Sequence, residues 1–126
     1  MKISKLDHLV LTVADLETTA SFYVSVMGMK KEVFGNGRVA LKAGSQKINL
    51  HALGKEFEPK AHKPTPGSAD LCFITQTPLD DAMAHVRRCG VEIIEGPVER
   101  NGANGPLRSF YFRDPDDNLI EVANEI

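Results

Sequence analysis

The first part of the chain carries a hydrophobic pattern that predicts one strand, one helix and three further strands. Apolar side chains recur at a period of two over residues 6–13, which is typical of a strand with one apolar face. Apolar residues then recur at helical spacing between an Asp15 N-cap and a Gly28 stop, so a helix of about three turns is expected. The three strands that follow are expected at 29–34, 38–43 and 47–53, with a Gly-Asn-Gly hairpin between the first two.

The same order of elements returns after residues 54–67, which hold three prolines and no apolar periodicity and therefore predict a surface connector. A strand at 69–75 is followed by a helix with Thr77 as its N-cap and Gly90 as its end. Three more strands are expected at 91–95, 109–113 and 119–123, with a glycine-rich loop at 96–107 between the first two.

An internal repeat emerges from the spacing of these elements. His8 to Gly28 and Asp70 to Gly90 both span 20 residues, so the leading halves superpose at an offset of 62. The last strands superpose at an offset of 70, which places His51 on Glu121. We therefore predict an α+β fold made of two βαβββ modules, at about 4–54 and 68–126, within a single domain spanning residues 1–126.

Four ionisable residues occupy the equivalent positions of the two modules: His8 and Asp70 on the leading strands, His51 and Glu121 on the trailing strands. His8, Asp70 and Glu121 have apolar neighbours such as Leu9, Leu71, Ile120 and Val122. Alternation therefore directs the ionisable side chains away from the helices and toward one shared cleft. Two imidazoles with one or two carboxylates suit a divalent transition metal that keeps positions open for water or substrate. The alternative for each is a solvated or structural polar residue, and for Asp70 a turn residue at a strand end.

The order of elements, the leading D-H-L-V-L-T-V, the helix segment F-Y-V-S-V-M-G-M and the closing Y-F-R-D-P-D-D-N-L-I-E resemble the vicinal oxygen chelate superfamily. This superfamily includes glyoxalase I, extradiol dioxygenases, and fosfomycin and bleomycin resistance proteins. The chain is most similar to single-domain members of the type called glyoxalase domain-containing protein 5, where K-E-F-E-P-K also occurs. The resemblance implies a cup-shaped mixed sheet. Pro115 fixes φ, and residues Asp114 to Asn118 are therefore expected to form a tight turn that orients Glu121. In that turn, Asn118 is suited to the left-handed region.

The resemblance also implies roles for individual residues. His8 matches the metal ligand of the first strand and Glu121 that of the last strand. His51 falls where glyoxalase I members often carry Glu, and Asp70 falls where His is usual. The expected metal ligands are therefore His8, His51 and Glu121, and the metal is a divalent transition ion such as Ni, Zn, Co, Mn or Fe.

The implied chemistry is a metal-assisted proton transfer on a substrate with two adjacent oxygens, as in lactoylglutathione lyase. Glu121 is the first candidate base and Asp70 the second. Arg100 is a candidate for binding an anionic substrate group and Tyr111 for lining the cavity, although a surface Arg and a packed Tyr explain both residues as well.

Two other functions fit the same residues. His8, His51 and Glu121 form a two-histidine, one-carboxylate set that suits ferrous iron and oxygen chemistry. A bleomycin-resistance-like protein would instead sequester its ligand in a metal-free cleft, although two histidines and two acids at equivalent positions weaken that interpretation.

Composition narrows the partners. The 126 residues carry 15 basic and 17 acidic side chains, a net charge of −2 with no basic block, which argues against nucleic acid or an anionic membrane as a partner. Two cysteines and the absence of an apolar leader favour a cytoplasmic protein. We expect a homodimer that binds a small molecule, including a thiol adduct as a candidate substrate.

Overall fold

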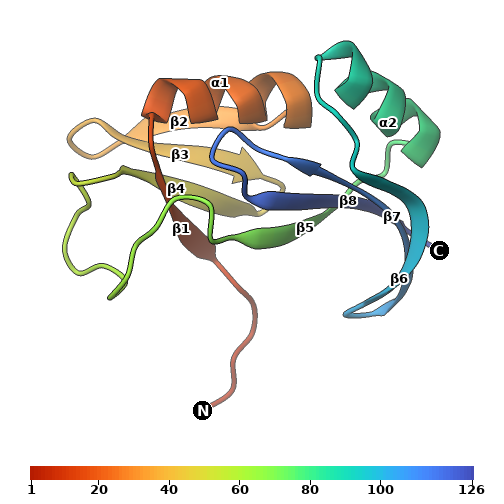
Figure 1. The fold of residues 1–126 in the computed structure, drawn as a ribbon. Coiled ribbons are helices and arrows are strands. Elements are labelled where there is room, and N and C mark those ends of the chain that lie inside the picture. The colour runs from red at the N-terminus through yellow and green to blue at the C-terminus, as the bar shows by residue number, and fades with distance from the viewer. The chain divides into compact units, whose positions relative to one another are not determined.

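A computed structural model describes all residues, 1–126, and divides the chain into two compact units, Met1–Pro66 and Gly67–Ile126. The first unit contains β1 (His8–Val13), α1 (Leu16–Met27), β2 (Lys30–Phe34), β3 (Arg38–Ala43) and β4 (Gln46–Ala52). Its sheet has the order β1-β4-β3-β2, with β1 parallel to β4 and the other pairs antiparallel, and α1 lies across one face (Figure 1).

The first unit folds as its sequence predicts because local signals and burial agree. Asp15 accepts a hydrogen bond from Thr18 N at 2.8 Å and begins α1, and Gly28 ends the helix in the left-handed region at φ 68°. One face of α1 buries Ala20 and Tyr23 against the apolar face of the sheet. Tyr23 is fully buried, and burial of a side chain of this size contributes about 1.5–3 kcal/mol to folding.

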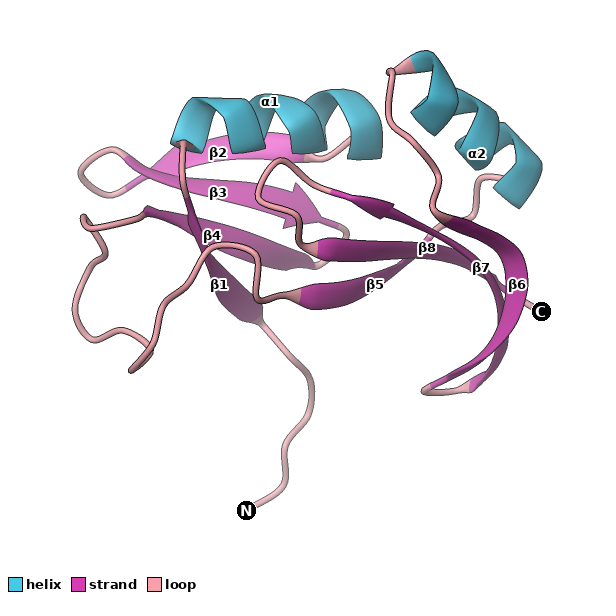
Figure 2. Ribbon diagram, in the orientation of Figure 1, coloured by secondary structure: helices cyan, strands magenta, loops and turns pink.

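The second unit repeats this topology. It contains β5 (Asp70–Ile74), α2 (Leu79–Arg88), β6 (Glu95–Gly102), β7 (Gly105–Arg113) and β8 (Leu119–Glu125). Its sheet has the order β5-β8-β7-β6, again with the first pair parallel and the rest antiparallel, and α2 packs against β7 (Figure 2). The predicted α+β class with duplicated βαβββ modules is confirmed.

Two predicted elements of the second unit are wrong. The glycine-rich segment expected as a loop is instead most of β6 and the start of β7. Of the residues expected as a strand at 91–95, residues 91–94 precede β6 and only Glu95 belongs to it. The Gly and Pro residues of β6 sit in an edge strand that contains a register shift between Glu95 and Val98, where such residues are tolerated. The helix α2 has Pro78 as its N-cap position, without a side-chain cap from Thr77.

The turn before β8 is tight, as expected, but a different residue takes the left-handed conformation. Asp117 has φ 65°, whereas Asn118 is 1% exposed and uses its side chain as a link. Asn118 Nδ2 donates to Asp114 Oδ2 at 2.9 Å, and Asn118 Oδ1 accepts from Ala69 N at 2.8 Å. Asn118 therefore joins the start of β8 to the residue that precedes β5.

Neither α1 nor α2 has the length and apolar character needed to cross a membrane.

Candidate functional site

The hydrogen-bond register of each unit shows which positions are equivalent. In the first unit His8 lies opposite Lys47 on the neighbouring parallel strand, and in the second unit Asp70 lies opposite Leu119. His8 and Asp70 each begin the leading strand of their module. The predicted equivalence of His8 and Asp70 is therefore confirmed.

The predicted equivalence of His51 and Glu121 is wrong by two residues. Glu121 lies opposite Cys72, two positions after Asp70, whereas His51 lies opposite Thr12, four positions after His8. The residue at the position of Glu121 is Asn49. A shift of two residues keeps a side chain on the same face of the sheet, which is why alternation alone did not reveal the error.

His8 is held by its chain neighbour. Its Nδ1 lies 2.9 Å from Asp7 Oδ2, and this hydrogen bond lowers the pKa of the Asp7 carboxyl. The His8 side chain is 45% exposed. When Nδ1 carries the proton and donates it to Asp7, Nε2 keeps a free lone pair, as in metal-binding histidines whose second nitrogen is bound to a carboxylate.

His51 lies in a different setting, within β4. It is 5% exposed, and its Nε2 is buried without a hydrogen-bond partner. Its ring meets Phe57 edge-on, with ring centroids 5.4 Å apart. Burial lowers the pKa of His51 below its usual 6.5, and the nearby Arg38 charge lowers it further, so the imidazole is neutral at pH 7.

In the second unit Glu121 is fixed by a buried hydroxyl. Ser109 is fully buried in β7, and its Oγ donates to Glu121 Oε2 at 2.6 Å. Cys72 and Tyr111 flank Glu121 on the two neighbouring strands. Burial, together with the charge of Glu121, raises the pKa of Cys72 to about 11, so this thiol stays protonated. Burial and the same carboxylate also raise the pKa of Tyr111.

Arg100, on β6, has partners within the second unit. Its Nε donates to Tyr111 Oη at 3.0 Å, one terminal nitrogen donates to Glu95 at 3.0 Å, and the other donates to the carbonyl of Glu99 at 3.0 Å. These contacts hold the Arg100 side chain beside Tyr111. Binding of an anionic substrate by Arg100, and lining of a cavity by Tyr111, stay predictions.

The carboxylates of Asp70 and Glu121 are not neutralised by any basic side chain. No Lys, Arg or His lies within ion-pair distance of either residue. Both project from the same face, because Glu121 lies opposite Cys72 and Cys72 shares a face with Asp70. Neither unit by itself gathers three His, Cys, Asp or Glu side chains that would hold a metal ion. The ligand set His8, His51 and Glu121, which takes residues from both units, stays a prediction.

Sequence reasoning missed three residues that these sheets present beside the predicted ones: Arg38, Asn49 and Ser109. Asn49 precedes His51 by two residues, so the same alternation that selected His51 also selects Asn49. Arg38 follows the hairpin glycines at the first position of β3. Ser109 gives no signal of its own, since a small polar residue in a strand is as well explained by packing.

Comparisons with known proteins agree with this fold. Residues 5–122 match the glyoxalase/bleomycin resistance protein/dioxygenase superfamily. Virulence protein STM3117 of Salmonella typhimurium is 55% identical over 126 residues, which cover 100% of this chain and 88% of that protein. Its crystal structure superposes with a TM-score of 0.98 and covers 100% of both chains.

Two further proteins extend the comparison. Glyoxalase domain-containing protein RDO1 of Mycosarcoma maydis is 52% identical over 124 residues, which cover 98% of this chain and 70% of that protein. A lactoylglutathione lyase from Agrobacterium tumefaciens shares the fold at 23% identity, with a TM-score of 0.74 and coverage of 98% of this chain and 96% of the lyase.

Proposed function

Because this chain belongs to the glyoxalase/bleomycin resistance protein/dioxygenase superfamily, we propose that it is a metal-dependent enzyme of the glyoxalase type. Its substrate is a small molecule that carries oxygen atoms on two adjacent carbons, and the reaction is a proton transfer like that of lactoylglutathione lyase. The observation that carries this proposal is the His8–Asp7 pair, which leaves an exposed imidazole nitrogen free to bind a metal.

The chemistry of the donor residues fits a divalent cation. His8 supplies an imidazole nitrogen, and the Glu121 and Asp70 carboxylates have no basic partner to neutralise them. His8 and Glu121 are therefore the proposed ligands. Asp70 is the proposed third ligand in place of His51, because it occupies the position equivalent to His8, whereas His51 lies four positions farther along its strand pair.

A bound cation would polarise the two substrate oxygens and stabilise negative charge that develops on them. Glu121 removes the proton from the substrate carbon and returns it to the neighbouring carbon, so one carboxylate acts first as base and then as acid. Ser109 donates to Glu121 Oε2 and thereby fixes the orientation of the carboxylate that accepts the proton. Cys72, whose thiol stays protonated, takes no part as a nucleophile.

Metal binding by purified variants tests the proposal. The protein is stripped with a chelator, reloaded with Ni, Zn, Co, Mn or Fe(II), and assayed for bound metal and for turnover of methylglyoxal with glutathione. His8→Gln and Glu121→Gln should each lose bound metal and turnover, and Asp70→Asn should weaken metal binding. His51→Gln is the matched control, since it removes an imidazole from the same sheet face but should keep the metal.

The outcomes separate the candidate functions. Wild-type protein that takes up less than about a tenth of an equivalent of metal after reconstitution contradicts the proposal and favours a metal-free binding protein. Loss of metal from His51→Gln with retention in Asp70→Asn would restore the ligand set of the sequence hypothesis. Oxygen consumption with catechols in the iron form would favour a dioxygenase.

The homodimer and the cytoplasmic location stay predictions. Light scattering of the purified protein checks the homodimer.

A further inference from the structure

One face of the sheet in the first unit holds three buried polar atoms that have no hydrogen-bond partner. They are Arg38 Nε, Asn49 Oδ1 and His51 Nε2. Asn49 lies opposite Ala40 in the antiparallel pair of β3 and β4. Arg38 lies two residues before Ala40 and His51 two residues after Asn49, so all three residues share this face on adjacent strands.

Such a concentration of unsatisfied groups is costly. Each buried donor or acceptor left without a partner destabilises the folded protein, and native proteins hold only a few such groups. The first unit holds four buried side-chain atoms without a hydrogen-bond partner. Three of them are the atoms named above, on two adjacent strands, and the fourth, Thr19 Oγ1, belongs to α1. A ligand with complementary groups would satisfy all three at once.

The charge around these atoms selects an anion. Arg38 makes no ion pair and no hydrogen bond, and Lys47, on the same face of β4, makes no ion pair. Their cationic groups lie against aromatic rings. The Arg38 guanidinium carbon is 4.6 Å from the centre of the Phe57 ring and 5.2 Å from that of Phe34, and Lys47 Nζ is 4.0 Å from that of Phe34. The guanidinium is thereby held in place without a counter-ion.

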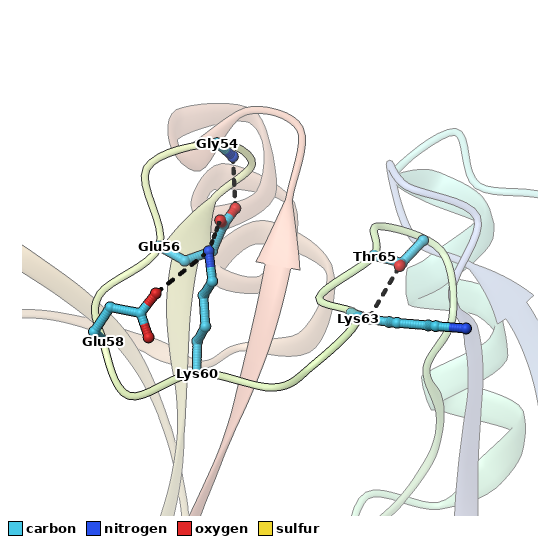
Figure 3. Close-up of polar contacts among 6 residues, drawn as sticks. All are labelled: Gly54, Glu56, Glu58, Lys60, Lys63 and Thr65. Atoms are coloured by element: carbon cyan, nitrogen blue, oxygen red, sulfur yellow. Dashed lines mark hydrogen bonds and ion pairs between the residues drawn. The ribbon is translucent and has the colours of Figure 1, made fainter.

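Phe57 covers both Arg38 and His51, and its position depends on the connector that follows β4. There the Glu56 carboxylate accepts hydrogen bonds from Gly54 N and, at 3.3 Å, from Lys60 Nζ, and Lys60 also lies 3.6 Å from Glu58 (Figure 3). The Glu56 side chain is only 5% exposed, whereas Phe57 itself is 43% exposed. The ring of Phe57 is thus the outermost member of the cluster and the part that a ligand must displace.

We propose that Arg38, His51 and Asn49 form a binding site for a small hydroxylated oxyanion, a hydroxycarboxylate or its phosphate or phosphonate counterpart. Arg38 donates to the oxyanion through its forked guanidinium, and neutral His51 donates its Nε2 hydrogen to a second oxygen. Asn49 Oδ1 accepts a hydrogen bond from a hydroxyl on the carbon next to the anionic group. The claim that this anion is the substrate rests on the proposed function. The claim that an anion binds here rests only on the residues of the first unit.

Binding of simple anions to metal-free protein tests the site without the metal. The probes are glycolate, acetate and inorganic phosphate, titrated by calorimetry and by the ¹⁵N shift of the His51 side chain. We expect glycolate to bind more tightly than acetate, because only glycolate carries the hydroxyl that Asn49 accepts. Arg38→Gln should weaken binding of every probe by about tenfold to a hundredfold, the value of a charge-assisted hydrogen bond.

Three further variants keep the test specific. Lys42→Gln removes a positive charge from the same strand and the same face, four residues from Arg38, and should leave the affinities unchanged. Asn49→Ala should abolish the preference for glycolate over acetate. Arg38→Lys keeps the charge but loses the fork and should bind with intermediate affinity, which covers the case in which Arg38→Gln does not fold.

Equal affinities for wild type and Arg38→Gln would overturn the inference, as would the absence of a His51 shift with every probe up to about 50 mM. Equal binding of glycolate and acetate would overturn the role of Asn49. Anion binding by a protein that takes up no metal would refute the proposed function and leave this site standing. Metal uptake without anion binding would refute the anion site and leave the proposed function standing.

Discussion

Replacement of Asn118 by Ala removes the side chain that links the two parallel strands of the second unit. Asn118 is buried, and its amide bonds to Asp114 on one side and to the backbone N–H of Ala69 on the other. Ala69 immediately precedes Asp70, and Asn118 precedes Leu119, the first residue of β8. The link therefore keeps the strands of Asp70 and Glu121 in register.

The cost of the Asn118→Ala substitution follows from what it leaves behind. The N–H of Ala69 loses its acceptor, and the Asp114 carboxylate, 4% exposed, loses one donor to an oxygen that water does not readily reach. An orphaned neutral group costs about 1–3 kcal/mol and a hydrogen bond to a charged group about 1.5–3 kcal/mol. The expected loss in the free energy of unfolding is about 3–5 kcal/mol, a large part of the stability of a domain of this size.

Urea unfolding followed by circular dichroism measures this loss on metal-free protein. The matched control is Asn101→Ala, an exposed Asn on β6, which should change stability by less than about 0.5 kcal/mol. Backbone amide exchange should accelerate at the N–H of residue 69 in the Asn118 variant. A loss below about 1 kcal/mol, or one equal to that of the control, would refute the reasoning that this amide holds the strands together.

Three other predictions concern the stability of the folded protein. In a double-mutant cycle of Ser109→Ala with Glu121→Gln, urea unfolding should yield a coupling energy of about 1 kcal/mol for their 2.6 Å hydrogen bond, and additive effects would contradict it. His51, whose folded-state pKa lies below 6.5, binds fewer protons folded than unfolded, so stability should fall as pH decreases through and below 6.5, and His51→Gln should flatten that slope. Gly67→Ala would place a Cβ 2.6 Å from Asp116 O and should cost about 1–3 kcal/mol more than Gly54→Ala, whose φ is similar and whose Cβ would meet nothing within 4 Å, as unfolding midpoints would show.

Much of the fold could be predicted because its signals are local. Asp15 and Gly28 act on the backbone within one turn of α1, so the sequence alone is enough to place both helix ends. The predicted cap of α2 is wrong because the helix begins at Leu79, one residue later than the motif implies. Pro78 therefore occupies the N-cap position, and Thr77 lies one residue before it. The strand β6 was missed because its pairing with β7 overrides the turn preference of Gly96, Pro97 and Gly102, and pairing with a distant segment leaves no local signal.

The candidate site was predictable in part. His8, Asp70 and Glu121 each begin a strand or follow a conspicuous turn motif, so the sequence marks them as outward-facing polar residues. Ser109 and Arg38 are recognisable only through their partners. Ser109 matters because it binds Glu121, and Arg38 because its guanidinium lies against the rings of Phe34 and Phe57. Partners that come from other strands are a property of the folded sheet.

The two-residue error in the predicted position of His51 shows which features of a strand can be predicted from sequence. Alternation determines which face of a sheet a side chain occupies, and His51 does lie on the face of His8. Its level along the strand depends on hydrogen-bond register, which is decided by pairing with β1 and β3 together. Four residues along a strand correspond to about 13 Å, and this separation is why we propose Asp70 in place of His51 as the third ligand. If His51 is not at the metal, its buried, unpartnered nitrogen needs another explanation, and the neighbouring Arg38 without a counter-ion supplies one in the form of an anionic ligand.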